Sequence, residues 1–273
     1  MDFPNDLRVI AVDWSGAQRG ARTKIWLAEV MDGELLRLEC GYSREELAQR
    51  LIDAGKGSVP LLVGLDFAFS YPAWFLEKRG LADAFALWEM AGSEGDQWLS
   101  DCDPPFWGRG RARPLEQENH RLTERGLRDG GFGRPKSVFQ IAGPGHVGTG
   151  SIRGMPILAV LHRGGFSIWP FEQPKLPMVV EIYPRVFSGA VTKSNPWERI
   201  RYCRERYPSL ARHHCDSITA SDDAFDAMVS AFEMDRLKSM LTSLPTPTKQ
   251  ESIEGIIWRP LTETRATNLA PNR

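Results

Sequence analysis

The sequence has few cysteines, no long apolar run and no excess of charge of one sign. Its four cysteines are widely spaced and form no Cys-x-x-Cys pair, which fits reduced thiols in the cytosol better than a disulfide framework. No apolar run approaches the roughly 18 residues of a membrane span, and the first residues lack the basic and apolar regions of a secretion signal. We therefore expect a cytoplasmic protein that does not enter the membrane.

The charges are balanced overall but not locally. Thirty-four Lys and Arg stand against 35 Asp and Glu, a formal net charge of −1, which favours neither a nucleic-acid binder nor a membrane-surface protein. Residues 105–136 are the exception, because they contain eight Lys or Arg and four Asp or Glu. This basic stretch is either a solvated loop or a lid or groove that contacts phosphates.

The order of apolar stretches and turn residues favours a single α/β domain over residues 1–262, with an insertion at about 92–136 and a flexible tail at 263–273. Three strands joined as hairpins come first, followed by alternating helices and strands. We expect strands at 8–13, 24–30, 34–40, 61–65, 137–141 and 178–187, and helices at 43–55, at 72–91 and from Ser221 onward.

Two of these strands end on an acid. "RVIAVDWSG" stops on Asp13, and "PLLVGLDFAFSYP" stops on Asp66. If the two strands are parallel neighbours, about 4.8 Å apart, both carboxylates lie at the same edge of the sheet. Two negative charges about 4 Å apart repel by roughly 4 kcal/mol at an effective dielectric near 20, so the pair needs a proton, a basic partner or a metal cation. The alternative is that each Asp caps a following turn.

The late helix carries three more acids, Asp222, Asp223 and Asp226, near its start. The helix dipole favours negative charge there, so the first two need no further explanation. Asp226 borders the apolar face formed by Phe225 and Val229, which directs it toward the sheet. If this helix packs against the edge with Asp13 and Asp66, the carboxylates converge into a site for Mg²⁺ or Mn²⁺, which can support phosphodiester hydrolysis.

Five segments, "VIAVDWSGA", "VGLDFAFSYP", "VVEIYPRVF", "SDDAFDAMVSAF" and "EGIIWRP", together resemble the family of predicted ribonuclease H-like nucleases called domain of unknown function 429. The resemblance implies a mixed five-stranded sheet, a three-strand antiparallel meander plus parallel strands, flanked by helices. It also implies a divalent-metal nuclease acting on DNA or RNA, with Asp13, Asp66 and the late helix as its site. Glu181 lies in a matching segment, either as a catalytic ligand or as a structural acid.

The choice of acid on the late helix is open. The Asp223-x-x-Asp226 spacing is similar to the last helix of RuvC-type resolvases, whereas the helical wheel prefers Asp222 with Asp226. We rank Asp226 first and Asp223 second as metal ligands.

Two other functions fit parts of the sequence. In an actin-like or sugar-kinase-like phosphotransferase, Asp13 and the glycine-rich segment 143–150 would hold the metal and phosphates of a nucleotide. A non-catalytic scaffold would use exposed aromatic residues to bind a partner, with Trp98, Phe106 and Trp107 as candidates.

Overall fold

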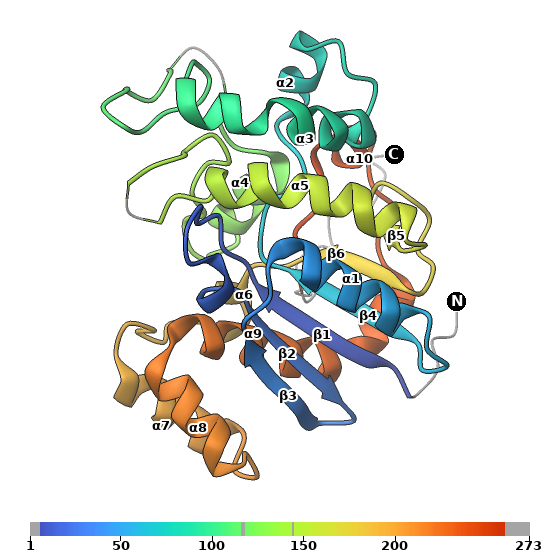
Figure 1. The fold of residues 1–273 in the computed structure, drawn as a ribbon, viewed down its shortest axis with the longest axis vertical. Coiled ribbons are helices and arrows are strands. Elements are labelled where there is room, and N and C mark those ends of the chain that lie inside the picture. The colour runs from blue at the N-terminus through green and yellow to red at the C-terminus, as the bar shows by residue number, and fades with distance from the viewer. Residues whose placement is uncertain (1–5, 116–117, 144, 260–273) are drawn as a thin grey trace, which may run out of the picture.

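The sheet is built around strand β1, which has a neighbour on each side. The computed structural model describes residues 6–115, 118–143 and 145–259, and within them the strands form one six-stranded mixed sheet in the order β3-β2-β1-β4-β6-β5 (Figure 1). The pairs β1–β2 and β2–β3 are antiparallel, while β1–β4, β4–β6 and β5–β6 are parallel. The strands are β1 (Arg8–Asp13), β2 (Trp26–Met31), β3 (Glu34–Cys40), β4 (Leu61–Leu65), β5 (Ser167–Ile168) and β6 (Met178–Glu181).

Helices cover both faces of this sheet. One face carries α1 (Arg44–Gly55), α5 (Gly148–Arg163) and, packed on α5, α3 (Ala84–Asp101). The other face carries α9 (Asp222–Arg236), with α6 (Pro184–Ser188), α7 (Pro196–Arg206) and α8 (Arg212–Ala220) beside it (Figure 1). The shorter elements are η1 (Ala21–Thr23), α2 (Ala73–Lys78), α4 (Leu122–Asp129), η2 (Lys238–Ser243) and α10 (Glu251–Glu254).

Strand β1 is apolar throughout because both of its faces are buried. Val9 and Ala11 belong to the core under α9, whereas Ile10 and Val12 belong to the core under α1 and α5. Side chains alternate between the faces of a strand, so Asp13 lies on the α9 face with Val9 and Ala11. This alternation decides which helix the acid can meet.

The structure confirms the meander, the helix after it and the parallel pairing of β1 with β4. The Ser43 hydroxyl accepts a hydrogen bond from the Glu46 N–H, and the Glu46 carboxylate accepts one from the Ser43 N–H, which forms a capping box at the start of α1. The helix expected at 72–91 is instead two helices, α2 and α3. The chain turns between them at Gly80, whose φ of 67° suits glycine.

Three other expectations about the elements are wrong. Residues 137–141 form no strand, and the only bridge there joins Gln140 to Trp107 within the described residues. Strand β6 ends at Glu181 rather than at 187, because Pro184 begins α6. The short β5 pairs with β6, so the sheet has six strands instead of five within the part of the chain described.

The predicted insertion, residues 92–136, begins inside α3 and then consists mostly of loops around α4. The tail predicted at 263–273 lies outside the described residues. Among the described helices, none combines the length and the apolar character needed to cross a membrane.

Candidate functional site

Asp13 and Asp66 lie side by side at the carboxyl edge of the sheet, as the sequence predicts. Asp13 is the last residue of β1, and Asp66 follows β4 directly. The two strands pair Val12 with Leu65, and the Asp66 N–H donates a hydrogen bond of 3.1 Å to the Val12 carbonyl. A Cβ at Gly64 would lie 2.5 Å from the Met234 sulfur of α9, so alternation places Asp66 on the α9 face as well.

Helix α9 brings two further carboxylates to this edge. Ser221 caps the helix, its hydroxyl accepting a hydrogen bond of 3.2 Å from the Ala224 N–H. Asp226 is largely buried, with 14% of its side chain exposed, and Asp223 is half-buried beside the pocket. Asp222 is exposed and does not line that pocket. The structure therefore assigns Asp223 rather than Asp222 to the cluster.

These carboxylates raise one another's pKa values. Burial raises the pKa of Asp13, and repulsion from Asp226, Asp66 and Asp223 raises it further. Burial, together with repulsion from Asp226, raises the pKa of Asp66 to about 8. Burial also raises the pKa of Asp226 to about 6, against the attraction of Lys193. The folded chain thus holds acids together that favour a bound proton or a bound cation.

Lys193, which the sequence analysis did not single out, supplies a cation to this cluster. It lies in the loop between α6 and α7, and its Nζ is 2.5 Å from Oδ2 of Asp226. Burial lowers the Lys193 pKa, but the carboxylates of Asp226, Asp66 and Asp13 together outweigh burial and hold that pKa above its usual value. A single lysine in an irregular loop gives no sequence pattern that would have pointed to it.

The donor set at this edge fits a hard divalent cation. Carboxylate oxygens are the ligands that Mg²⁺ and Mn²⁺ prefer. Oδ1 of Asp226 is buried and has no hydrogen-bond partner among the described residues, so it has an unused lone pair. In the described part of the chain, however, no three His, Cys, Asp or Glu side chains are already arranged to hold a metal ion. A cation would have to draw the carboxylates closer together.

Glu181 ends a neighbouring strand but faces the opposite side of the sheet. Met178 and Val180 of β6 pack under α9, so alternation places Glu181 on the other face of the sheet. It still lines the same pocket as Asp66, and its charge adds to the raised pKa of Asp66. Its Oε1 and Oε2 accept hydrogen bonds from Arg121 of 2.5 and 2.9 Å, and Oε2 also accepts one from the Phe69 N–H. Both oxygens are therefore occupied within the protein.

Arg121 joins the insertion to the sheet. It is fully buried, and its guanidinium donates to Glu181, Glu124 and the Glu254 carbonyl through Nε, Nη1 and Nη2. Burial lowers the Arg121 pKa, but the Glu124 and Glu181 carboxylates outweigh burial and raise that pKa. Since these bonds use all of its donors, Arg121 acts as a structural anchor.

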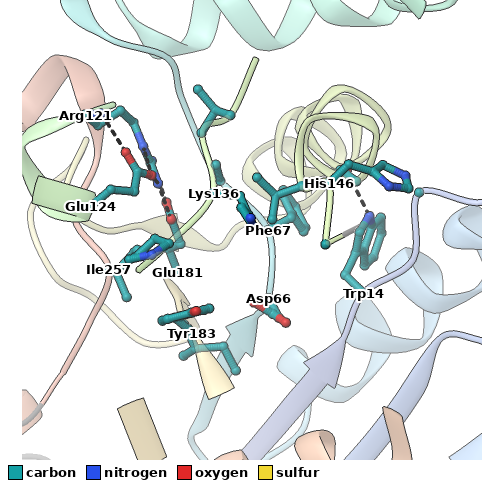
Figure 2. Close-up of a pocket in the computed structure, with 18 of the residues that line it drawn as sticks. Trp14, Asp66, Phe67, Arg121, Glu124, Lys136, His146, Glu181, Tyr183 and Ile257 are labelled. Carbon is teal, nitrogen blue, oxygen red and sulfur yellow. Dashed lines mark hydrogen bonds and ion pairs between the residues drawn. The ribbon is translucent and has the colours of Figure 1, made fainter. Parts of the chain in front are cut away.

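A pocket of about 400 Å³ opens beside the carboxylates. Figure 2 shows Asp66 at its base, with the Arg121 network on one side and Trp14 and His146 on the other. Trp14 donates a hydrogen bond of 3.2 Å to the Gly150 carbonyl and packs on Phe67 with ring centroids 4.8 Å apart. Burial and the charge of Asp66 raise the pKa of Tyr183, which also lines the pocket.

The loop after Asp13 is fixed against the start of α5. A Cβ at Gly16 would collide with the backbone of Gly150, so only glycine fits there. Arg153 donates to the Gly16 carbonyl, and Arg44 donates to the Ser15 carbonyl. The small residues after Asp13 and at 148–150 thus allow the two backbone segments to pack closely.

Comparisons with protein-family models, curated proteins and solved structures find no match for this chain. The fold and the site above are therefore the grounds for assigning a function.

Proposed function

We propose that this protein is a divalent-metal-dependent nuclease that hydrolyses phosphodiester bonds in DNA or RNA. One observation carries the proposal: Asp13, Asp66 and Asp226, from three separate elements, meet at the carboxyl edge of the sheet, where their pKa values are raised. Stability alone does not favour such a cluster, because each buried carboxylate opposes the others. Raised pKa values in a cleft are typical of functional sites.

The order of the elements supports a ribonuclease H-like fold for the proposed enzyme. A three-strand meander, β1 to β3, continues into the parallel strands β4 and β6, and a late helix with acids at its start packs on β1. The resemblance of the sequence to predicted ribonuclease H-like nucleases also supports this fold. Strand β5 is an addition at the far edge, away from the carboxylates.

Asp13, Asp66, Asp226 and Asp223 would hold Mg²⁺ or Mn²⁺, which would supply an activated water and stabilise the leaving oxygen of a phosphodiester. Trp14 and Phe67 form an apolar wall of the pocket that restricts water next to the acids. Lys193 balances the charge of Asp226 in the metal-free protein. Glu181 and Arg121 anchor the insertion and are assigned no chemical step.

The test is cleavage of fluorescent single-stranded, duplex, hybrid and branched oligonucleotides with Mg²⁺, with Mn²⁺ or with EDTA. We expect cleavage that requires the metal, that is lost in Asp13→Asn and Asp226→Asn, and that persists in Asp222→Asn. Asp222→Asn is the matched control because it removes an exposed acid from the same helix turn. Circular dichroism of each variant verifies that it is folded.

Two results would overturn the proposal. Metal-dependent cleavage that survives in Asp13→Asn would come from a contaminating nuclease. No cleavage of any substrate, together with thermal stabilisation by ATP and Mg²⁺, would favour the phosphotransferase.

A further inference from the structure

A second cavity, of about 690 Å³, lies in the insertion next to the carboxylate pocket. We call it the basic groove, and its side chains include Trp107, Arg113, His120, Arg128, Arg134 and Lys136. None of the described residues that line it is Asp or Glu. It therefore presents a concave, positively charged surface in a chain with a net charge of only −1.

Three cations of the basic groove have no acidic partner within the described part of the chain. Arg113, Arg134 and Lys136 form no ion pair with any described residue, whereas Arg128 pairs with Asp129 at 3.3 Å. Just outside the groove, Arg111 likewise pairs with Asp103 at 3.3 Å. Unpaired cations gathered in one cavity repel each other, and this arrangement is typical of a site for an anionic ligand.

An aromatic surface accompanies these charges. Trp107 is half-buried, and the guanidinium carbon of Arg113 lies 5.7 Å from its ring centroid. The backbone of Trp107 is fixed on both sides, since its N–H donates to the Phe139 carbonyl and its carbonyl accepts from the Ile141 N–H. A fixed indole ring beside unpaired cations is suited to binding a nucleotide. The base would stack on the ring, and the phosphates would contact the cations.

The basic groove continues into the carboxylate pocket. Pro135 and Lys136 line both cavities, and Lys136 appears in Figure 2 among the residues around Asp66. A strand bound along the groove would thus extend past Lys136 toward the acids. A duplex keeps its bases stacked inside and cannot offer one to Trp107, so this geometry favours a single strand.

We infer that the basic groove binds the backbone and bases of single-stranded nucleic acid and guides it to the carboxylate pocket. The inference rests on the proposed function for its direction toward the acids. Binding itself requires no metal and no cleavage, so it is tested separately.

The experiment measures fluorescence anisotropy of a labelled oligothymidylate with the full chain in EDTA, over a series of salt concentrations. If the three unpaired cations contact phosphates, log K should fall with log salt with a slope of about −2, and each of Arg134→Ala and Lys136→Ala should reduce the magnitude of that slope by about 0.7. Loss of base stacking in Trp107→Ala should weaken binding by about fivefold to more than a hundredfold. Arg113→Gln tests the same surface should Trp107→Ala fail to fold.

The matched control is Arg204→Ala, which removes an exposed arginine from α7, away from the insertion (Figure 1). It should leave affinity and salt slope unchanged. Equal affinities for Arg134→Ala and Arg204→Ala, or no binding by the wild type, would overturn the inference. Tighter binding of a duplex of matched sequence would overturn the single-strand assignment.

The outcomes also separate the two proposals. Metal-dependent cleavage with unaltered binding in all groove variants would contradict the basic groove and leave the nuclease standing. Groove-dependent binding without cleavage under any metal would support the groove and contradict the nuclease.

Discussion

The Nζ of Lys193 lies 2.5 Å from Oδ2 of Asp226, and its charge also interacts with Asp66 and Asp13. The Lys193 ammonium offsets negative charge at this edge, where burial and repulsion from Asp226 raise the pKa values of Asp13 and Asp66. Lys193 therefore stabilises the metal-free protein, and a bound metal ion would take over part of that role.

Lys193→Met should lower the stability of the metal-free protein by about 1–3 kcal/mol, somewhat less than the loss of a fully buried ion pair because both side chains are partly exposed. Millimolar Mn²⁺ should recover part of the loss. Calorimetric melting with EDTA and with Mn²⁺ checks both effects. Lys56→Met is the control, since Lys56 is 67% exposed and its pair with Asp53 contributes little. Equal melting temperatures for the two variants would contradict the role given to Lys193.

In the metal-free protein, the contribution of Asp66 and Asp226 to stability should fall as pH rises from about 4 to about 8. The folded pKa of Asp66 is about 8 and that of Asp226 about 6, both above the ordinary value of 3.8. In this window the folded state binds more protons than the unfolded state, so raising the pH favours unfolding. Urea denaturation in EDTA across this range measures the effect, taken as the difference between wild type and Asp66→Asn.

That difference has a defined sign. Asp66→Asn removes the titration, so its stability relative to the wild type should increase toward pH 8. Asp222→Asn, at an exposed position, should follow the wild type. A difference that shrinks toward pH 8 would mean that Asp66 is stabilised as a carboxylate.

Glu181→Gln should destabilise the fold without removing metal binding. The substitution leaves the buried Arg121 with one carboxylate partner fewer, which costs about 2–5 kcal/mol. Its Mn²⁺ response should persist, because Glu181 faces away from Asp13. Melting curves with and without Mn²⁺ separate these effects. A folded Glu181→Gln protein that had lost its Mn²⁺ response would identify Glu181 as a ligand.

Gly16→Ala should destabilise the protein by about 1–3 kcal/mol, since the new Cβ would collide with the backbone of Gly150. Gly92→Ala is the matched control. Gly92 lies inside α3, and its Cβ would meet Pro156 only at 3.8 Å, so the change should be neutral or stabilising by up to ~1 kcal/mol. Thermal melting compares the two variants. An unaltered melting temperature in Gly16→Ala would mean that the Asp13 loop can move away from α5.

Local signals in the sequence predicted much of the fold and part of the site. Ser43 and Ser221 mark helix starts through capping, a short-range interaction that a single sequence displays. Asp13 and Asp66 could be paired because each ends an apolar strand and a helix lies between the two strands. Asp226 could be directed to the sheet from its place beside the apolar face of α9.

The remaining parts of the site depend on long-range contacts. Lys193 and Asp226 are 33 positions apart in the sequence, and Arg121 and Glu181 are 60 positions apart. No periodicity in the sequence indicates that either pair is in contact. The apolar pattern predicts a strand that runs on to 187, so it does not indicate that Glu181 ends β6 and faces the other core. The basic groove likewise arises from loop residues of the insertion, which only the folded chain brings together.

The most direct test of the metal-site claim is isothermal titration of Mn²⁺ into metal-free wild type and metal-free Asp13→Asn, with melting curves of both proteins to verify folding. We predict saturable Mn²⁺ binding and a raised melting temperature in the wild type, with both effects absent in a folded Asp13→Asn protein. Absence of Mn²⁺ binding in the wild type, or equal binding in the two proteins, would contradict a carboxylate metal site at Asp13.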